Sequence, residues 1–252
     1  MIIFKSKGQR NFFGLIIFAI TFFIFFFKSN LFAIKKIDVV KNNIPCATEN
    51  QLQNSLGLTG KNFFLLDVKD TQVSLKSKYI CIKDVKLSRI LPNKIKLEVI
   101  GRIPWVSLIQ VKNIEASGSS IIENIATPSA TQIDEVLTAD MEGVVFLKNN
   151  FINNIPKIYV YNILQNDYLK KSLKILQYLK IIGMDNTETN IINNFLITNS
   201  IPRVIFKLDQ DLSLQIASLQ LILQRAKIDS KELEFIDLRF DKPIVKFAPK
   251  KN

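Results

Sequence analysis

The sequence predicts an α+β protein with a single N-terminal transmembrane helix, a small β-α-α-β-β unit, and a mixed β-sheet unit with two helices. Three observations lead to this fold class. An uncharged apolar run lies near the N-terminus, at residues 12–27. Residues 33–105 show the alternation and capping signals of strand, helix, helix, strand and strand. Residues 137–248 mix strand-like alternation with two helical stripes, which predicts a sheet with helices packed against it.

The apolar run, FFGLIIFAITFFIFFF, has the composition of a membrane span. As a helix that rises about 1.5 Å per residue, it covers about 24 Å of the roughly 30 Å hydrocarbon core. Snorkelling of Lys28 and burial of the apolar residues after it would close this gap. We therefore predict a short tail at residues 1–11 and a transmembrane helix at residues 12–32, with the anchoring side chains Phe12, Phe18, Phe22 and Phe27.

A cleaved secretory signal peptide is the competing interpretation of this run. A signal peptide has a shorter apolar region, and the small residues that follow here, Ser29 and Ala33, lack the spacing of a cleavage site. A retained anchor is therefore the better prediction.

The charges around the run leave its orientation open. Three basic residues precede it and three follow it, so the positive-inside rule gives no preference; they are Lys5, Lys7, Arg10, Lys28, Lys35 and Lys36. Without these six, the chain keeps 28 of its 34 basic residues against 22 acidic ones, a net charge of +6. This mild excess favours solubility and some attraction to anionic lipid or wall polymer, and it is too small to predict a nucleic-acid surface.

The composition also restricts the chemistry of the chain. The sequence contains no histidine, which removes Ser-His-Asp and Cys-His catalytic arrangements and most zinc sites. It contains no glycine-rich nucleotide-binding motif. Paired carboxylates such as Asp209 and Asp211, or Glu232 and Glu234, are best interpreted as solvated surface groups. We expect no catalytic residue, cofactor, metal or small-molecule substrate.

The two cysteines, Cys46 and Cys81, lie far apart in the sequence. A disulfide can form between them if this part of the chain lies outside the cytoplasm, but buried free thiols are the commoner state and are what we expect. An alternative function uses either thiol as the nucleophile of a membrane-tethered wall hydrolase or transpeptidase. That alternative lacks the histidine on which such a thiolate normally depends.

The first unit begins with a strand and a capped helix. Ile37 and Val39 alternate with polar residues, which predicts a short strand with one buried face. Thr48 and Gln51 then form a capping box at the start of a helix, and Gly57 provides the left-handed residue that ends it.

A second helix and a hairpin complete this unit. Asp67 can cap a helix whose stripe contains Leu75. Apolar and polar residues alternate at residues 83–91 and 94–103, and the dipeptide Pro92-Asn93 between them predicts a hairpin turn.

In the second unit, we expect a loop or insertion at residues 106–136, where small polar residues replace aromatic ones. Gly143 then allows a hairpin turn within residues 139–147. The remaining predicted elements are strands at 155–160, 191–198, 203–208 and 212–216, helices at 167–182 and 217–227, and a closing β segment at 233–247 before a tail at 249–252.

Several strings in the first unit carry a family resemblance: IKKIDVVKN, ENQLQNSLGL, GKNFFLLD and VKLSRILPNKIKLEVIGRIPWVSL. Together they closely resemble the POTRA domain of the bacterial cell-division family FtsQ, called DivIB in Gram-positive bacteria. The most recognisable phrase is Arg-x-x-Pro-Asn-x-x-x-x-x-Val, followed by Arg102 and Pro104. One departure is Gly101-Arg102-Ile103, where the family usually has glutamate and arginine before the proline, so no role of that glutamate is transferred.

The C-terminal segment LEFIDLRFDKPIVKF resembles the same family. Its Ile-Asp-Leu-Arg-aromatic phrase, followed by one more short strand, is the strongest single match. The resemblance covers residues 5–247 except the insertion, and it implies that residues 137–248 are an FtsQ-type β domain.

The resemblance implies a function as well as a fold. Members of this family are non-enzymatic bitopic scaffolds whose extracytoplasmic β domain binds two small single-pass coiled-coil proteins, FtsB and FtsL. Through these partners they help to regulate septal peptidoglycan synthesis. The resemblance also implies a plasma-membrane protein at the division septum, with residues 1–11 in the cytoplasm and the bulk of the chain outside.

A physical mechanism is available at the C-terminus. An exposed last strand offers unpaired N–H and C=O groups with which a partner segment can pair. We expect the aromatic residue after Asp-Leu-Arg to be the leading contact, followed by residues of the last strand; the set is Phe240, Lys242, Ile244, Val245 and Phe247.

A purely structural interpretation of this segment competes with that one. Ile236 and Leu238 would face the core, and Asp237 and Arg239 would form a pair that stabilises the fold. Pro243 would interrupt the ladder and shorten the usable edge. A different function is also open: a POTRA-type, membrane-anchored chaperone for exported polypeptides would bind unfolded chains at a sheet edge formed by residues 83–103.

Overall fold

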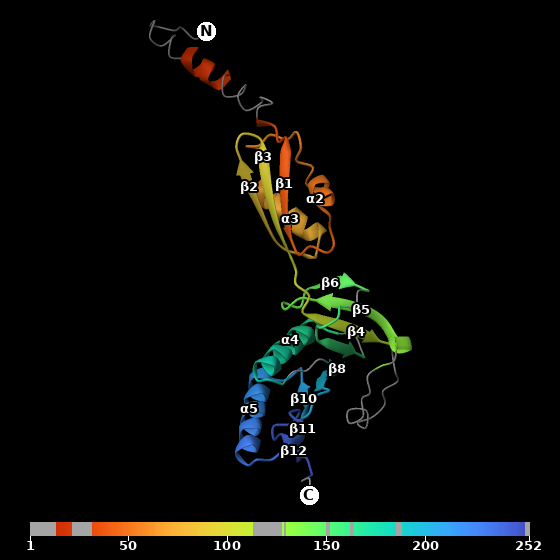
Figure 1. Cartoon of the computed structure of the whole chain (residues 1–252). Coiled ribbons are helices and arrows are strands. Elements are labelled where there is room, and N and C mark those ends of the chain that lie inside the picture. Colours follow the sequence, from red (N-terminus) through yellow and green to blue (C-terminus); the bar gives the residue numbers. More distant parts are fainter. Residues whose placement is uncertain are drawn as a thin grey trace, which may run out of the picture. The chain divides into compact units, whose positions relative to one another are not determined.

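A computed structural model describes the chain at residues 14–21, 32–112, 128, 130–149, 152–161, 164–184 and 188–249. The chain divides between Arg102 and Ile103 into two compact units, which Figure 1 shows. Residues 14–21 are helical and include the exposed Phe18. The other predicted anchor side chains, Phe12, Phe22 and Phe27, lie outside the described residues. Among the helices that are described, none is both long enough and apolar enough to cross a bilayer.

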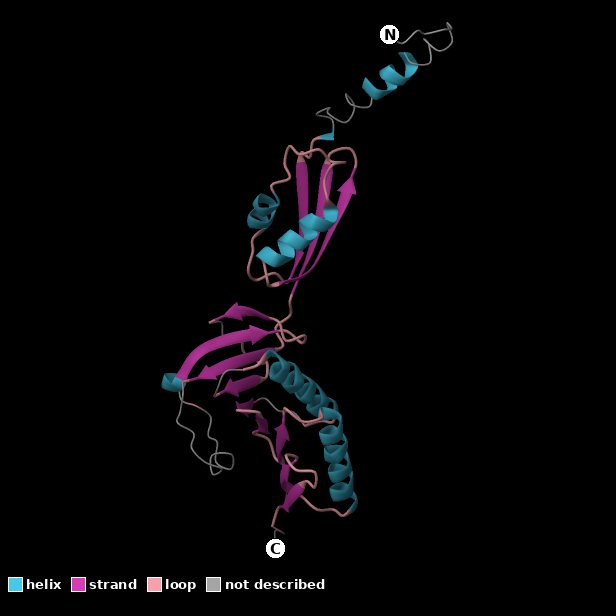
Figure 2. Cartoon of the chain, turned by 180° about the vertical axis from the view of Figure 1, so that it is seen from behind, coloured by secondary structure: helices cyan, strands magenta, loops and turns pink. Residues whose placement is uncertain are grey.

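The first unit is a three-stranded sheet with two helices. Strand β1 (Lys36–Asn42) pairs in parallel with β3 (Lys94–Gly101), which pairs antiparallel with β2 (Ile82–Ile90), in the order β1-β3-β2. Helices α2 (Glu49–Leu56) and α3 (Val68–Lys78) cover one face of this sheet, as Figure 2 shows. The predicted β-α-α-β-β order is confirmed.

The predicted helix caps of this unit are present. Thr48 Oγ1 accepts the N–H of Gln51 at 3.3 Å, and Gln51 Oε1 accepts the N–H of Thr48 at 2.9 Å, which completes the capping box. Gly57 ends α2 at a left-handed φ of 53°. Asp67 Oδ1 accepts the N–H of Asp70 at 3.0 Å at the start of α3.

The two cysteines form a disulfide, so the prediction of free thiols is wrong. Their Cα atoms lie 6.3 Å apart. The reason is the sheet topology: the end of β1 and the start of β2 both flank the end of β3, since Asn42 pairs with Ile100 and Ile82 pairs with Gly101. Cys46 follows β1 and Cys81 precedes β2, so the fold brings them to the same end of the sheet.

Gly101 has a structural explanation. A Cβ atom at this position would overlap the backbone carbonyl of Asn43, which crosses close to the end of β3. Only glycine permits such an approach. The departure from the family pattern at residue 101 therefore follows from the backbone packing of this chain.

The second unit is a nine-stranded mixed sheet with two long helices on one face (Figures 1 and 2). The sheet order is β12-β11-β10-β9-β8-β7-β4-β5-β6. The elements are β4 (Val106–Val111), the 3-10 helix η3 (Ala130–Gln132), β5 (Ile133–Ala139), β6 (Val145–Lys148), β7 (Lys157–Val160), α4 (Asn166–Ile181), β8 (Glu188–Ile192), β9 (Phe195–Thr198), β10 (Arg203–Lys207), α5 (Leu212–Ile228), β11 (Leu233–Asp237) and β12 (Ile244–Phe247).

Two apolar clusters lie on opposite faces of this sheet. The larger one joins the sheet to α4 and α5 and includes Leu173, Leu219 and Phe206. The smaller one contains Ile109, Tyr159, Ile197 and Ile205, which alternate along their strands with residues of the first cluster. A sheet with both faces covered buries most residues of its central strands, and β4 and β10 have that burial pattern.

The predicted loop at residues 106–136 is too long at both ends. Strand β4 lies inside the sheet between β5 and β7, and β5 begins at Ile133. Both faces of β4 are covered, so its sequence VSLIQV lacks the alternation that marks a half-buried strand.

Two further strand predictions are wrong. Residues 191–198 are not one strand, because the chain turns between β8 and β9, with Asn193 at a left-handed φ of 54°. Residues 212–216 are the first turns of α5, which begins at Leu212 because the Asp211 side chain accepts the N–H of Ser213 at 2.7 Å.

The other predicted elements of this unit are present. Strands β5 and β6 form the predicted hairpin, with Gly143 at a φ of 82° in the turn. Helix α4 and strands β7 and β10 lie within a few residues of their predicted bounds. The closing segment forms β11 and β12.

Candidate functional site

The last strand of the chain lies at an edge of the nine-stranded sheet. Strand β12 pairs antiparallel with β11, in a register that joins Ile244 to Asp237, Val245 to Ile236 and Lys246 to Phe235. Among the described strands, none lies beyond β12 in the sheet order. The C-terminal edge is therefore accessible for pairing with another chain.

Along β12, the backbone N–H and C=O groups of successive residues point alternately toward β11 and away from the sheet. The N–H of Ala248 donates to the carbonyl of Glu232 at 2.9 Å, so residue 248 faces β11. Along an antiparallel strand every second residue does the same. Lys246 and Ile244 therefore face β11, and the N–H and C=O groups of Val245 and Phe247 point away from the sheet.

The side chains of β12 lie on two different faces. Val245 is half-buried and packs against the core beneath α5. Ile244 lies on the opposite face and is 53 % exposed. Lys246 lies on that face too, where its Nζ contacts Glu234 Oε1 at 2.8 Å. Phe247 is exposed, with Lys231 Nζ 5.2 Å from the centre of its ring.

A buried ion pair fixes the turn that leads into β12. Asp237 is only 2 % exposed, and its two carboxylate oxygens accept bonds from Arg239 Nε at 2.9 Å and 3.0 Å and from a terminal guanidinium nitrogen at 2.6 Å. The guanidinium carbon of Arg239 lies 5.4 Å from the centre of the Phe195 ring and 5.5 Å from that of Phe240. The structural interpretation of this pair is confirmed, and the pair also positions Phe240.

Phe240 lies at a pocket between this turn and α5. The pocket has a volume of about 370 Å³, and Leu214, Ser218 and Pro243 line it together with the exposed Phe240. Lys242 is exposed in the same turn. Pro243 directly precedes β12, so it does not interrupt the pairing of β12 with β11.

A second pocket, of about 570 Å³, lies on the opposite face beside the same edge. Arg203, Phe235 and Lys246 form one cross-strand row in it, and the exposed Ile201 lies near them. None of these residues is among the contacts that the sequence predicts, although Phe235 and Lys246 lie in the predicted closing segment. Only the pairing of β10, β11 and β12 brings them together, and no local pattern signals it.

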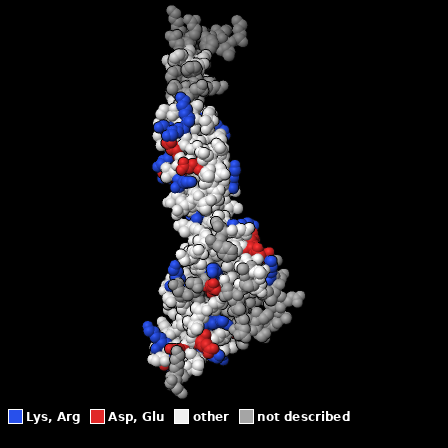
Figure 3. Space-filling model, turned by 45° about the vertical axis from the view of Figure 1, so that its right-hand side comes forward, with Lys and Arg blue, Asp and Glu red and all other residues white. Residues whose placement is uncertain are grey.

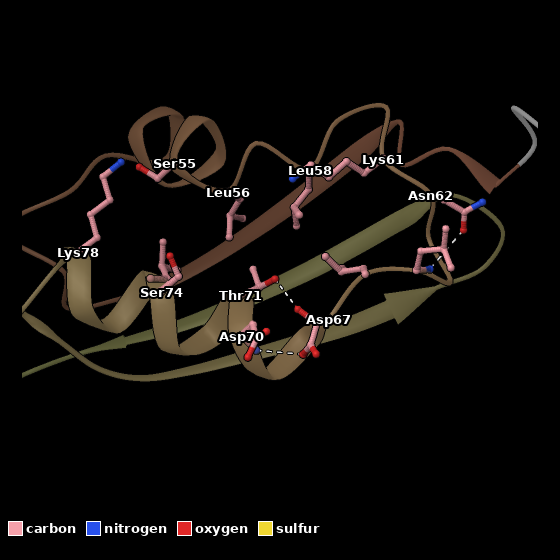
Figure 4. Close-up of a pocket in the computed structure, with 13 residues that line it drawn as sticks. Ser55, Leu56, Leu58, Lys61, Asn62, Asp67, Asp70, Thr71, Ser74 and Lys78 are labelled. Atoms are coloured by element: carbon pink, nitrogen blue, oxygen red, sulfur yellow. Dashed lines mark hydrogen bonds between the residues drawn. The ribbon is translucent and has the colours of Figure 1, made fainter. Parts of the chain in front are cut away.

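The first unit has a pocket of about 520 Å³ between α2, α3 and the loop that joins them, shown in Figure 4. Its acidic residues serve the start of α3. Asp67 caps the helix, and Thr71 Oγ1 donates to the Asp67 carbonyl at 2.6 Å. Over the described parts of the chain, no group of three or more His, Cys, Asp or Glu side chains could hold a metal ion.

The edge of the first sheet differs from the one predicted for a chaperone. Strand β3 lies in the middle of the sheet, so residues 94–101 offer no edge. Of the predicted segment at residues 83–103, the part that lies at an edge of the sheet is β2. That alternative therefore keeps half of its proposed binding surface.

The first unit matches the model of a known family. A family model described as "POTRA domain, FtsQ-type" matches residues 32–102. This range contains the three-stranded sheet and the helices α2 and α3 of the first unit. No curated protein matches the chain. The FtsQ-type domain supports a division-related scaffold role in general and implies protein–protein interactions within the division machinery. The chain therefore contains an FtsQ-type POTRA domain, and this domain supports its assignment to the FtsQ/DivIB family of bacterial cell-division proteins.

Proposed function

We propose that this chain is a bitopic, non-enzymatic scaffold that captures FtsB-like and FtsL-like coiled-coil proteins at β12 and so helps to regulate septal peptidoglycan synthesis. The observation that carries the proposal is the edge position of β12, with the N–H and C=O groups of Val245 and Phe247 directed outward. A partner segment that adds a strand there gains main-chain hydrogen bonds, and alternate side chains provide selectivity.

The side chains around this edge suit such a partner. The exposed Ile244 and Phe247 offer apolar surface on the two faces of the added strand. Phe240 and Lys242 extend the surface into the turn before β12. The two pockets beside the edge could accept side chains of the partner.

In this proposal, residues 12–32 anchor the chain in the plasma membrane at the division septum, with residues 1–11 in the cytoplasm. The Cys46–Cys81 disulfide supports that orientation, because disulfides persist outside the cytoplasm. The disulfide also weakens the hydrolase alternative, since no described cysteine keeps a free thiol to act as a nucleophile.

The test separates backbone pairing from side-chain contact. Proline is tolerated at an edge-strand position whose N–H faces solvent, so Phe247→Pro should keep the fold and remove one outward N–H. Phe247→Ala keeps that N–H and loses the same side chain. We expect co-purification of two short coiled-coil proteins from a detergent extract to fall much further with Phe247→Pro than with Phe247→Ala.

A charge on the edge provides a second arm. Ile244→Glu places a carboxylate on an exposed position, whereas Val245→Glu would force one against the core, so the former is the cleaner probe. Leu221→Glu, at an exposed position of α5, is the matched control. Partner capture that survives both Ile244→Glu and Phe247→Pro would overturn the proposal.

A second candidate function rests on β2, an edge strand of the first sheet with the exposed apolar residues Ile90 and Leu91 at its end. A POTRA-type chaperone would bind diverse unfolded exported polypeptides there. Binding of unfolded chains that is lost with Arg89→Pro and kept with Phe247→Pro would favour this function over the scaffold.

A further inference from the structure

Three segments meet at one end of the POTRA domain. The N–H of Ile34 donates to the carbonyl of Lys61 at 2.9 Å, and the N–H of Phe63 donates to the carbonyl of Phe32 at 2.8 Å. The N–H of Lys35 donates to the carbonyl of Asn93 at 2.9 Å. Residues 32–36, 60–65 and 89–94 therefore form one surface, which we call the basic end.

The charge of the basic end has one sign. The three segments contain five cationic residues and no Asp or Glu: Lys35, Lys36, Lys61, Arg89 and Lys94. Lys36 pairs with Asp38 at 2.9 Å, outside the segments, and Arg89 donates to the carbonyl of Leu66 at 2.5 Å. Lys35, Lys61 and Lys94 are exposed. Figure 3 shows Lys and Arg side chains at this end of the unit, where its described residues begin.

The same end exposes large apolar side chains. Leu65 is 80 % exposed and Leu91 is 68 % exposed, and Ile90 and Phe64 are exposed to a lesser degree. Asn62 Oδ1 accepts the N–H of Phe64 at 2.8 Å and that of Leu65 at 3.4 Å, which holds this loop in place. The Phe64 ring also packs edge-to-face on Phe32 at 5.0 Å. Apolar side chains grouped beside lysines on one surface are typical of an interaction site.

The covalent chain limits where this surface can lie. Phe32 is the fifth residue after Phe27, the end of the apolar run, so a fully extended chain spans at most about 18 Å between the two. If residues 12–32 span the bilayer, the basic end lies at the lipid headgroups on the side of the bulk of the chain.

We propose that the basic end is a membrane-contact surface that binds anionic phospholipid. Leu65 and Leu91 enter the interface between headgroups and acyl chains, and Lys35, Lys61 and Lys94 bind headgroup phosphates. The contact fixes the tilt of the POTRA domain on the membrane and sets the direction in which the rest of the chain leaves it. This inference rests on the proposed anchor.

The test measures tryptophan fluorescence, which is simple in this chain because Trp105 is its only tryptophan. Trp105→Phe removes it, and Leu91→Trp then places a single indole at the basic end of the full-length protein. The protein is reconstituted into phosphatidylcholine vesicles with and without phosphatidylglycerol, and brominated lipid serves as the quencher. Ile80→Trp in the same background is the matched control, because residue 80 is exposed at the opposite end of β2.

We expect the indole at position 91 to show quenched, blue-shifted emission in vesicles with phosphatidylglycerol, and the indole at position 80 to show neither. Replacing Lys35, Lys61 and Lys94 with Gln should abolish the dependence on phosphatidylglycerol, since each lysine near an anionic surface strengthens binding about fivefold. Flotation with the vesicles after an alkaline wash shows separately whether the protein is anchored in the bilayer, and circular dichroism checks that it is folded.

The outcomes are distinguishable. A protein that floats with the vesicles while position 91 stays as unquenched as position 80 overturns this proposal and leaves the anchor intact. A folded protein that does not float overturns the anchor and this proposal together. Quenching at position 91 that is equal in both lipid compositions overturns the assignment to anionic phospholipid.

Discussion

At the scale of single residues, the buried carboxylate of Asp237 matters most for the candidate site. Its oxygens are satisfied by Arg239, which in turn lies between two aromatic rings. Removing one partner of a buried pair leaves an uncompensated charge, which costs about 3 kcal/mol, whereas an exposed pair contributes about 0 to 1 kcal/mol.

We therefore predict that Arg239→Ala lowers the free energy of unfolding by about 3 kcal/mol. Asp237→Ala should cost less, because the Arg239 side chain is partly exposed and can reach water. The double variant should cost less than the sum of the two. Urea unfolding measures all three, with Glu234→Ala, which breaks the exposed Glu234–Lys246 pair, as the control. Equal costs for the buried and the exposed pair would contradict this prediction.

Tyr159 provides a pH-dependent test of the sheet. Burial in the smaller apolar cluster, and then the nearby carboxylate of Glu188, raise the pKa of its hydroxyl from 10.0 to about 12. The folded protein therefore keeps this proton up to about pH 12, whereas the unfolded chain loses it near pH 10. Unfolding releases a proton in that range, so stability is fully present below pH 10 and falls as the pH rises toward 12.

We predict that the free energy of unfolding of wild type falls between pH 10 and 12 more steeply than that of Tyr159→Phe. The difference in stability between the two proteins should change by up to about 2 to 3 kcal/mol over this range. Chemical denaturation at several pH values measures it, and the comparison cancels the titration of lysines and the other tyrosines. Parallel curves would show that the hydroxyl ionises as freely in the folded protein as in the unfolded chain.

Sequence reasoning succeeds at single residues when the interaction is local. The caps at Thr48 and Asp67 join residues three apart, so their pattern is visible in the chain. Cys46 and Gly101 are different, because their partners, Cys81 and Asn43, are remote in sequence. Their roles depend on which strand ends lie together, which no local pattern specifies.

At the scale of elements, the start of α5 shows how a tertiary contact decides between strand and helix. Leu212, Leu214 and Ile216 alternate as in a strand, and this alternation led to the wrong prediction. Gln215 provides the competing interaction: its Oε1 accepts the N–H of Lys207, and its Nε2 donates to the carbonyl of Lys207, both at 2.8 Å. This side chain joins the first turn of the helix to the end of β10.

We predict that Gln215→Leu lowers the free energy of unfolding by about 1 to 3 kcal/mol, because it leaves the partly buried backbone N–H of Lys207 without the Gln215 side chain as its acceptor. Since β10 pairs with β11, which carries β12, the same change should also weaken partner capture. Gln224→Leu, at an exposed position of the same helix, is the control for helix propensity. Equal stability of the two variants would contradict a joining role for Gln215.

The strands show the same dependence on context. Half-buried β2 and β3 alternate clearly and were predicted within two residues of their bounds. Strand β4 lies between two neighbours with both faces covered, so its residues do not alternate and it was taken as loop. Burial on both faces removes the signal on which strand prediction relies.

At the scale of the whole molecule, the order of strands decides what the chain can bind. Strand β12 is the last strand in the sequence and is also an edge strand, so the predicted edge was correct. Strand β4 was not predicted, because it lies between β5 and β7, two strands that come later in the chain. Its burial on both faces depends on these later strands. An edge strand that follows the other strands in the sequence is easier to predict than a strand in the interior of a mixed sheet.

The orientation of the chain in the membrane is the property that the sequence left open, with three basic residues on each side of the apolar run. The disulfide supports the proposed orientation, because its two cysteines lie on the large side of the run and cytoplasmic thiols stay reduced. We predict that in cells wild-type Cys46 and Cys81 react with a maleimide only after reduction. Replacing Lys5, Lys7 and Arg10 with Gln leaves basic residues only after the run, so the positive-inside rule then favours the reverse orientation, and a fraction of the chains should expose thiols before reduction. Lys28→Gln shifts the charge balance the other way and should leave both cysteines protected.

The mass shift of each protein on a gel measures how many of its thiols the maleimide has labelled. Wild-type thiols that react without reduction would place the bulk of the chain in the cytoplasm, where it could not reach a septal partner.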